Sequence, residues 1–191
     1  MRQSTRSWNV CVRNFPRSYG AASRESFLVV RLQASAQMPL VQTRDFGELS
    51  YDPEAGLTFP CGIPGFDDQH RFVLIENLAL APVILLQSID TASLCFLAIP
   101  VTVLDPEYQS GIAPEDLRVL GLDETRQPQT GEEALYLAIL ASSDGASFTA
   151  NLLAPVIVHR RTRAAVQAVR HDQLYSHCHP LPPGLLEHLC S

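Results

Sequence analysis

The side chains of this chain best suited to chemistry gather near its carboxyl end. They are His171, His177, Cys178, His179, His188 and Cys190. Imidazole and thiolate groups are good zinc ligands, but structural zinc sites bring ligand pairs at short spacing from two places in the chain. Here His177 and His179 would point to one side of an extended segment, and no second pair is evident. The pattern favours a polar tail that contains histidines over a metal site.

The remaining reactive groups do not form a recognisable active site. Cys61 is a candidate exposed thiol, but nucleophilic catalysis also needs a base and an orienting group, and only His70 lies nearby in sequence. Four pairs of adjacent acids flank turns, where carboxylates are usually solvated: Asp67-Asp68, Glu115-Asp116, Asp123-Glu124 and Glu132-Glu133. The sequence contains no P-loop, dinucleotide-binding, nucleophile-elbow or zinc-protease motif. We therefore expect no catalytic residues and no cofactor, and predict that the protein is not an enzyme.

The cysteines indicate a reducing compartment. There are five, an odd number without C-x-x-C spacing, at positions 11, 61, 95, 178 and 190. This pattern is typical of neither a disulfide framework nor a zinc site. Cys95 stands inside an apolar run and is predicted to be a small core residue. The cytoplasm is the simplest location.

Charge is distributed unevenly along the chain. Residues 1–37 hold six arginines and one acid, whereas residues 38–191 hold eight arginines and nineteen acids, which gives net charges of +5 and −11. Phosphate binding needs a basic face, so the acidic body argues against nucleic acid as a direct ligand. It favours a basic partner, although acidity also simply keeps domains soluble. No apolar run reaches the length of about 18 residues that a membrane span needs.

From residue 46 onward, short apolar runs alternate with turn residues. The runs predict nine strands, at residues 46–51, 56–59, 72–76, 83–87, 94–100, 135–141, 147–153, 156–160 and 164–169. Asp144-Gly145 supplies the positive φ that a tight hairpin needs between two of them. Pro64-Gly65 suits a type II turn, because proline presets φ and glycine accepts the left-handed position.

One helix is predicted, at residues 114–120. Pro114 suits a first-turn position, and Glu115 and Asp116 suit the positive end of the helix dipole. The stretch 134–140 is ambiguous, since residues 130–133 resemble a capping box whereas its length and the following turn favour a strand. We interpret it as a strand. The chain is therefore predicted to be an all-β, mainly antiparallel protein, a small closed or partly closed barrel with one or two short helices.

Several sequence pieces, in a fixed order, resemble the FliW family of bacterial flagellar assembly factors. The resemblance covers about residues 44–180. Its pieces are Phe46-Gly47, Phe59-Pro60-Cys61-Gly62-Ile63-Pro64-Gly65-Phe66, Phe72-Val73-Leu74-Ile75, Pro82, Leu86-Gln87-Ser88, Phe96-Leu97-Ala98-Ile99-Pro100, Tyr108, Thr149-Ala150-Asn151-Leu152-Leu153-Ala154-Pro155, Gln167 and Tyr175.

The resemblance implies a cytoplasmic, non-enzymatic protein with two protein partners. One is the translational regulator CsrA, whose binding relieves repression of flagellin synthesis, and the other is flagellin itself. CsrA is an RNA-binding dimer with a basic surface, to which the acidic body is complementary. The alternatives are a small-molecule-binding or enzymatic β-barrel with a pocket at the barrel mouth, and a purely structural adaptor.

Two sets of residues are singled out for the site. Partner binding is predicted at exposed acids beside turns: Asp67, Asp68, Glu115 and Asp116. Family-motif residues are predicted to be structural: Pro60, Gly62, Pro64, Gly65, Phe66, Gln87, Asn151 and Pro155. The Arg- and Ser-rich residues 1–37 have the composition of a transit peptide. Because the resemblance begins only after Met38, we interpret them as a disordered or non-native extension, followed by a domain at 38–180 and a tail at 181–191.

Overall fold

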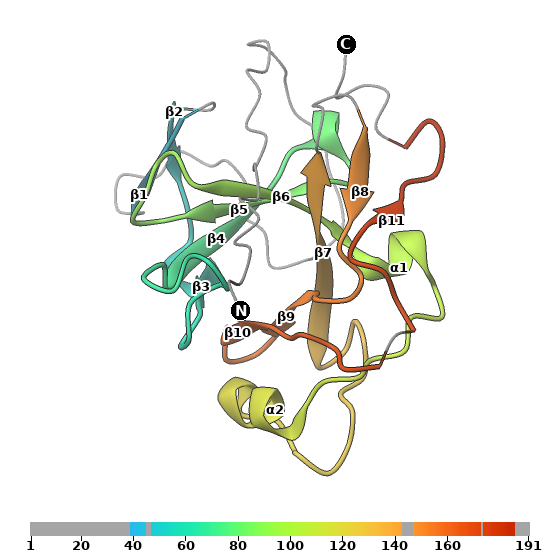
Figure 1. The fold of residues 1–191 in the computed structure, drawn as a ribbon. Coiled ribbons are helices and arrows are strands. Elements are labelled where there is room, and N and C mark those ends of the chain that lie inside the picture. The colour runs from blue at the N-terminus through green and yellow to red at the C-terminus, as the bar shows by residue number, and fades with distance from the viewer. Residues whose placement is uncertain (1–38, 45–46, 143–146, 173, 186–191) are drawn as a thin grey trace, which may run out of the picture.

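A nine-stranded sheet organises the computed structural model, which describes residues 39–44, 47–142, 147–172 and 174–185 (Figure 1). The continuous order of the sheet is β10-β9-β7-β6-β5-β4-β3, all paired antiparallel, and β8 joins β7 and β11 beside it. The strands are β3 (Gly56–Thr58), β4 (Arg71–Glu76), β5 (Ile84–Ser88), β6 (Cys95–Pro100), β7 (Ala134–Ser142), β8 (Phe148–Ala150), β9 (Val156–His159), β10 (Ala165–Gln167) and β11 (His179–Pro180). A separate hairpin pairs β1 (Leu40–Thr43) with β2 (Gly47–Ser50).

Helices are few and short in the residues that the structure describes, as predicted. They are α1 (Val101–Leu104), α2 (Pro114–Leu120) and two 3-10 turns, η1 (Pro53–Ala55) and η2 (Leu78–Leu80). In α2, Pro114 occupies the first turn, and Gly121 ends the helix in the left-handed conformation at φ 73°. Each of the nine predicted strands matches an observed strand, whereas β1, β11 and α1 were not predicted.

The ambiguous stretch before the predicted hairpin is a strand, as we interpreted it. Residues 134–142 form β7, which pairs antiparallel with β8 from Leu140 to Ser142. The Asp144-Gly145 turn itself lies outside the described residues. The carboxylate of Glu133 accepts a hydrogen bond from the backbone N–H of Gln129 at 3.0 Å. A capping-box pattern therefore makes a local hydrogen bond here without starting a helix.

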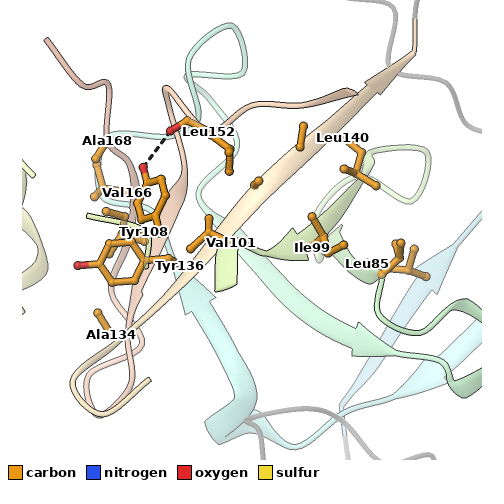
Figure 2. Packing of buried hydrophobic residues seen from close by; sticks show 14 of the residues in the cluster. Leu85, Ile99, Val101, Tyr108, Ala134, Tyr136, Leu140, Leu152, Val166 and Ala168 are labelled. Carbon is orange, nitrogen blue, oxygen red and sulfur yellow. Dashed lines mark hydrogen bonds between the residues drawn. The ribbon is translucent and has the colours of Figure 1, made fainter. Parts of the chain in front are cut away.

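Both faces of the sheet are buried, which explains why its strands read as continuous apolar runs. In β4, Phe72 and Leu74 belong to one hydrophobic cluster, and Val73 and Ile75 belong to the other. Successive side chains of a strand point to opposite faces, so β4 supplies both clusters, as do β5, β6, β7, β9 and β10. Figure 2 shows part of the larger cluster, where Tyr136, Ile99 and Leu85 follow one another across three strands.

The smaller cluster brings the two ends of the sheet together. It contains side chains of the strands themselves, including Leu57 of β3 and Ala165 of β10, and of the turn after β3. An isolated parallel bridge between Thr58 and Ala164 joins these ends. A mainly antiparallel β fold is thus confirmed. The closed barrel stays a prediction, because one bridge rather than a paired ladder connects β3 and β10.

Candidate partner-binding surface

The segment after β3, residues 59–66, forms a tight turn fixed by two glycines. Gly62 has φ +70°, and a Cβ there would lie 2.7 Å from the carbonyl oxygen of Asp67. Gly65 has φ +86° with open space around it, which agrees with the expected left-handed position. Ile63 and Phe66 exchange two backbone hydrogen bonds of 3.3 and 2.6 Å. The turn is therefore a defined structure that leaves Pro60 and Pro64 exposed.

The turn and the residues that follow it contact β5 and β6 beside the loop that joins these two strands. The ring of Phe66 meets that of Phe96 edge to face at 5.2 Å, and the hydroxyl of Ser88 donates to Oε1 of Gln69 at 3.0 Å. The buried amide nitrogen of Gln87 lies within 3.4 Å of four backbone carbonyl oxygens of this loop, those of Ser88, Thr91, Ala92 and Leu94. Two pieces of the family pattern thus form one folded unit.

The acids that follow this turn, Asp67 and Asp68, are exposed, as expected of a contact surface. Asp90, in the adjoining loop, forms an exposed ion pair with Arg71. The backbone of Arg71 also accepts a hydrogen bond from Ile89 at 2.9 Å. Asp67 and Asp68 therefore offer carboxylates on a well-ordered support.

The second acid pair corrects one expectation. Glu115 is exposed, but Asp116 is only partly exposed on α2, a helix that packs against β10. Burial raises the pKa of Asp116 above its usual value, and the charge of Glu115 adds to the rise while His171 opposes it. The prediction that all four acids are exposed is wrong for Asp116. Within the described part of the chain, no hydrogen bond or ion pair links this pair to Asp67 and Asp68.

Asn151 and Pro155 shape the connection between β8 and β9. The side-chain oxygen of Asn151 accepts from the backbone N–H of Ala154 at 2.9 Å. The carbonyl of buried Pro155 accepts from Ala168, and the amide of Gln167 donates to the carbonyl of Ala154, both at 3.0 Å. Asn151 is one of the polar residues that readily satisfy backbone groups in turns. These contacts fix the connection between β8 and β9, two strands that pair with different parts of β7.

Sequence reasoning missed a buried arginine, Arg170, whose side chain is 3% exposed. Its guanidinium binds the carboxylate of Asp172 at 2.5 and 3.0 Å and donates to the carbonyl of Gln109. It also lies 5.4 Å from the ring centroid of Tyr108 and 4.9 Å from that of Tyr175. Burial opposes the charge, but the hydrogen bond to Asp172 and the interaction with Tyr108 outweigh it, so the pKa of Arg170 is raised. We call these five residues the Arg170 clasp.

The clasp ties the carboxyl-terminal segment to the loop after α1. The hydroxyl of Tyr108 donates to the carbonyl of Leu152 at 2.9 Å (Figure 2), and burial raises the pKa of Tyr108 to about 12. Tyr175 donates to Asp105 at 3.2 Å. Tyr108 and Tyr175 stood out in the sequence as pieces of the family pattern. Arg170 gave no comparable signal, because an arginine two residues from an aspartate is typical of an exposed pair.

The histidine and cysteine residues near the carboxyl end do not gather in the part of the chain that the structure describes. No group of three or more His, Cys, Asp or Glu residues there could hold a metal ion, and His188 and Cys190 lie outside it. Cys61 and Cys178 are exposed thiols, whereas Cys95 is partly buried against the larger cluster. None of the helices described has the length and apolar character needed to cross a membrane.

Comparisons with known proteins agree on one family. The family model described as FliW protein matches residues 40–181. A flagellar assembly factor FliW of Heliobacterium modesticaldum is 34% identical over 144 residues, 75% of this chain and 91% of the relative. The factor of the same name from Bacillus subtilis is 29% identical over 142 residues, 74% of this chain and 96% of the relative.

A solved structure supports the same assignment. The crystal structure of the flagellar assembly factor FliW superposes with a TM-score of 0.64 at 29% sequence identity, covering 76% of this chain and 98% of that one. These descriptions name an assembly role and indicate no catalytic activity. The match of the family model over most of the chain decides the question: the chain belongs to the FliW family of flagellar assembly factors.

Proposed function

We propose that this protein acts in the cytoplasm by binding CsrA, which relieves the repression of flagellin synthesis, and that it also binds flagellin. The level of flagellin would then control its own translation, since the two partners compete for one protein. Membership of the FliW family supports this proposal most directly. The net charge of −11 over residues 38–191 supports it independently, because a basic RNA-binding partner is attracted to an acidic surface.

We place the CsrA contact at Asp67 and Asp68, with Glu115 as a further candidate. The first two carboxylates are exposed beside a turn whose backbone is held by hydrogen bonds and by the Phe66–Phe96 ring contact. A rigid support lowers the conformational entropy lost on binding. Asp116 is the weakest of the four candidates, because its carboxylate is partly buried.

Flagellin binding would use apolar contacts, because the terminal segments of flagellin are amphipathic helices. Large apolar side chains that are well exposed in the described residues are Leu40, Leu78, Val103, Val169 and Leu174. Both Val169 and Leu174 directly precede a clasp residue in the chain, Arg170 and Tyr175 respectively. They are therefore the first positions to test for flagellin binding.

A binding experiment with matched variants tests the CsrA proposal. The double variant Asp67→Lys/Asp68→Lys should lower the association rate with CsrA, and salt raised from about 0.05 to 0.5 M should lower it for the wild type. The control Glu107→Lys/Glu132→Lys changes the net charge equally at two other exposed acids and should have a smaller effect. Equal effects of the two variants on the association rate would contradict the site assignment. If the wild type failed to bind CsrA, or failed to bind flagellin, the proposed function would be contradicted.

A further inference from the structure

The hairpin between β9 and β10, residues 159–164, is organised by a buried imidazole. His159 is 7% exposed, and its Nδ1 accepts hydrogen bonds from the backbone N–H groups of Arg161 at 3.1 Å and Thr162 at 3.4 Å. A ring nitrogen that accepts hydrogen bonds carries no proton. His159 is therefore neutral in this arrangement, with its proton on Nε2. The backbone bonds of the hairpin join His159 to Arg163 at 3.0 Å and to Ala164 at 2.8 Å.

This hairpin also connects the two ends of the sheet. The carbonyl of Arg163 accepts from the backbone N–H of Thr58 at 3.0 Å, beside the Thr58–Ala164 bridge. The Nε of Arg163 donates to the carbonyl of Glu54 at 2.9 Å. Arg163 reaches these partners from a backbone with φ 64°, which residues other than glycine seldom adopt. The contact with β3 is thus made by the same hairpin whose backbone N–H groups bind the imidazole.

Charges on the hairpin itself oppose a further positive charge. Burial lowers the pKa of His159, and the nearby charge of Arg161 lowers it further. Burial and the charge of Arg160 likewise lower the pKa of Arg163. A protonated His159 would become a fourth cation within five consecutive residues.

Acids on neighbouring elements offset the positive charge of the hairpin only in part. Glu133, which precedes β7, raises the pKa of His159, but its carboxylate is already bound to Arg126 at 2.6 Å. Asp52 and Glu54, beside and within η1, act on Arg163. Among the described residues, none of these carboxylates forms an ion pair with His159.

We propose that His159 is a pH-dependent latch: its neutral imidazole holds the 159–164 hairpin against β3, and protonation of Nδ1 releases it. Protonation removes the acceptor for two backbone N–H groups and places a proton between them. The hairpin then loses the conformation that presents the carbonyl of Arg163 to Thr58. Since β3 leads directly into the turn at 59–66, release also loosens one anchor of that turn.

The direction of the pH effect follows from the linkage between proton binding by His159 and opening of the hairpin. The pKa of His159 is below the ordinary value of 6.5 in the closed state and returns toward that value once the hairpin opens. The closed hairpin is therefore most stable at a pH above the ordinary pKa. It becomes less stable as the pH falls from there toward the lower pKa of the closed state. Within that window, uptake of one proton increases the opening constant by up to about tenfold per pH unit.

Hydrogen exchange of the whole chain, corrected for the intrinsic pH dependence of exchange, tests the latch. Between pH 7.5 and 5.5, the wild type should lose protection at Thr58 and at residues 161–163 by several-fold. The variant His159→Asn keeps an acceptor that does not titrate. Its protection at Thr58 and at residues 161–163 should therefore not change with pH. The control His171→Asn, at an exposed histidine, should behave like the wild type.

A measurement on the wild type alone guards against a variant that fails to fold. The ¹⁵N chemical shifts of the imidazole should show an unprotonated Nδ1 and a protonated Nε2 at pH 7.5. A proton on Nδ1 at that pH would overturn the proposal. So would protection of Thr58 that is independent of pH in the wild type, or a loss of protection in His159→Asn equal to that of the wild type.

Discussion

Replacing Arg170 by methionine gives a direct test of how the carboxyl-terminal segment is held. Methionine keeps much of the length of the side chain but removes the charge and all hydrogen-bond donors. The guanidinium binds Asp172 and the carbonyl of Gln109 and contacts the rings of Tyr108 and Tyr175. The expected loss of folding stability is therefore the sum of the free energies of these interactions, reduced by what the buried apolar methionine side chain contributes.

The magnitude follows from the hydrogen bond to the carbonyl of Gln109 and the contacts with the rings of Tyr108 and Tyr175. A hydrogen bond from a charged group to a carbonyl contributes about 1.5–3 kcal/mol, and each desolvated contact between a cation and an aromatic ring contributes about 0.5–2 kcal/mol. With partial compensation by the methionine, we expect Arg170→Met to lower the free energy of unfolding by about 2–4 kcal/mol. For a chain of this size that corresponds to a fall of about 5–15 °C in Tm.

Urea unfolding followed by circular dichroism measures this change, and two controls separate its causes. Arg170→Lys keeps the charge but not the planar group that spans two rings and a carboxylate, so it should recover only part of the loss. Asp172→Asn removes the exposed partner and should cost less than Arg170→Met. A value for Arg170→Met within about 0.5 kcal/mol of the wild type, the range of ordinary surface substitutions, would refute the idea that the clasp stabilises the fold.

Three further substitutions test the folded unit formed by the turn and its neighbouring loop. Gly62→Ala should destabilise by about 2–4 kcal/mol in thermal unfolding, since positive φ and a backbone clash combine there, whereas Gly65→Ala, with open space, should cost only about 1 kcal/mol. An equal cost at both glycines would contradict this reasoning. Gln87→Leu leaves converging carbonyls without their shared donor and should cost about 1–3 kcal/mol. Unchanged stability would show that water replaces the amide.

Local rules predicted much of the fold. The apolar runs located nine strands, and Pro114 and Gly121 marked the ends of α2. The misses have causes outside the local sequence. Residues 101–104 are rich in β-branched side chains, which favour strands, yet they form the helical turn α1, whose Val101 is buried in the larger cluster. The two residues of β11 form a strand only because they pair with β8. No local pattern contains that information.

The candidate site was predicted less well, for two different reasons. The partial burial of Asp116 was accessible from the sequence, because residues four apart share a helix face and Leu120 is buried. The role of Arg170 was not accessible. Its ring partners lie in two segments, and Tyr108 is 62 positions away along the chain, so only the folded structure brings them together.

Measuring both the free energy of unfolding and CsrA binding should distinguish the family-motif residues from the exposed acids. Asn151 bonds to the backbone of its own connection, so Asn151→Ala should lower the free energy of unfolding by about 1 kcal/mol and reduce CsrA affinity only as far as the folded fraction falls. Asn151→Asp keeps the acceptor and serves as its control. The exposed Asp67 and Asp68 should show the reverse, unchanged stability with slower association. If Asn151→Ala instead weakened CsrA binding at full stability, the motif would be contact surface. Recognition would then depend on the most family-like part of the chain and not on its acidic surface.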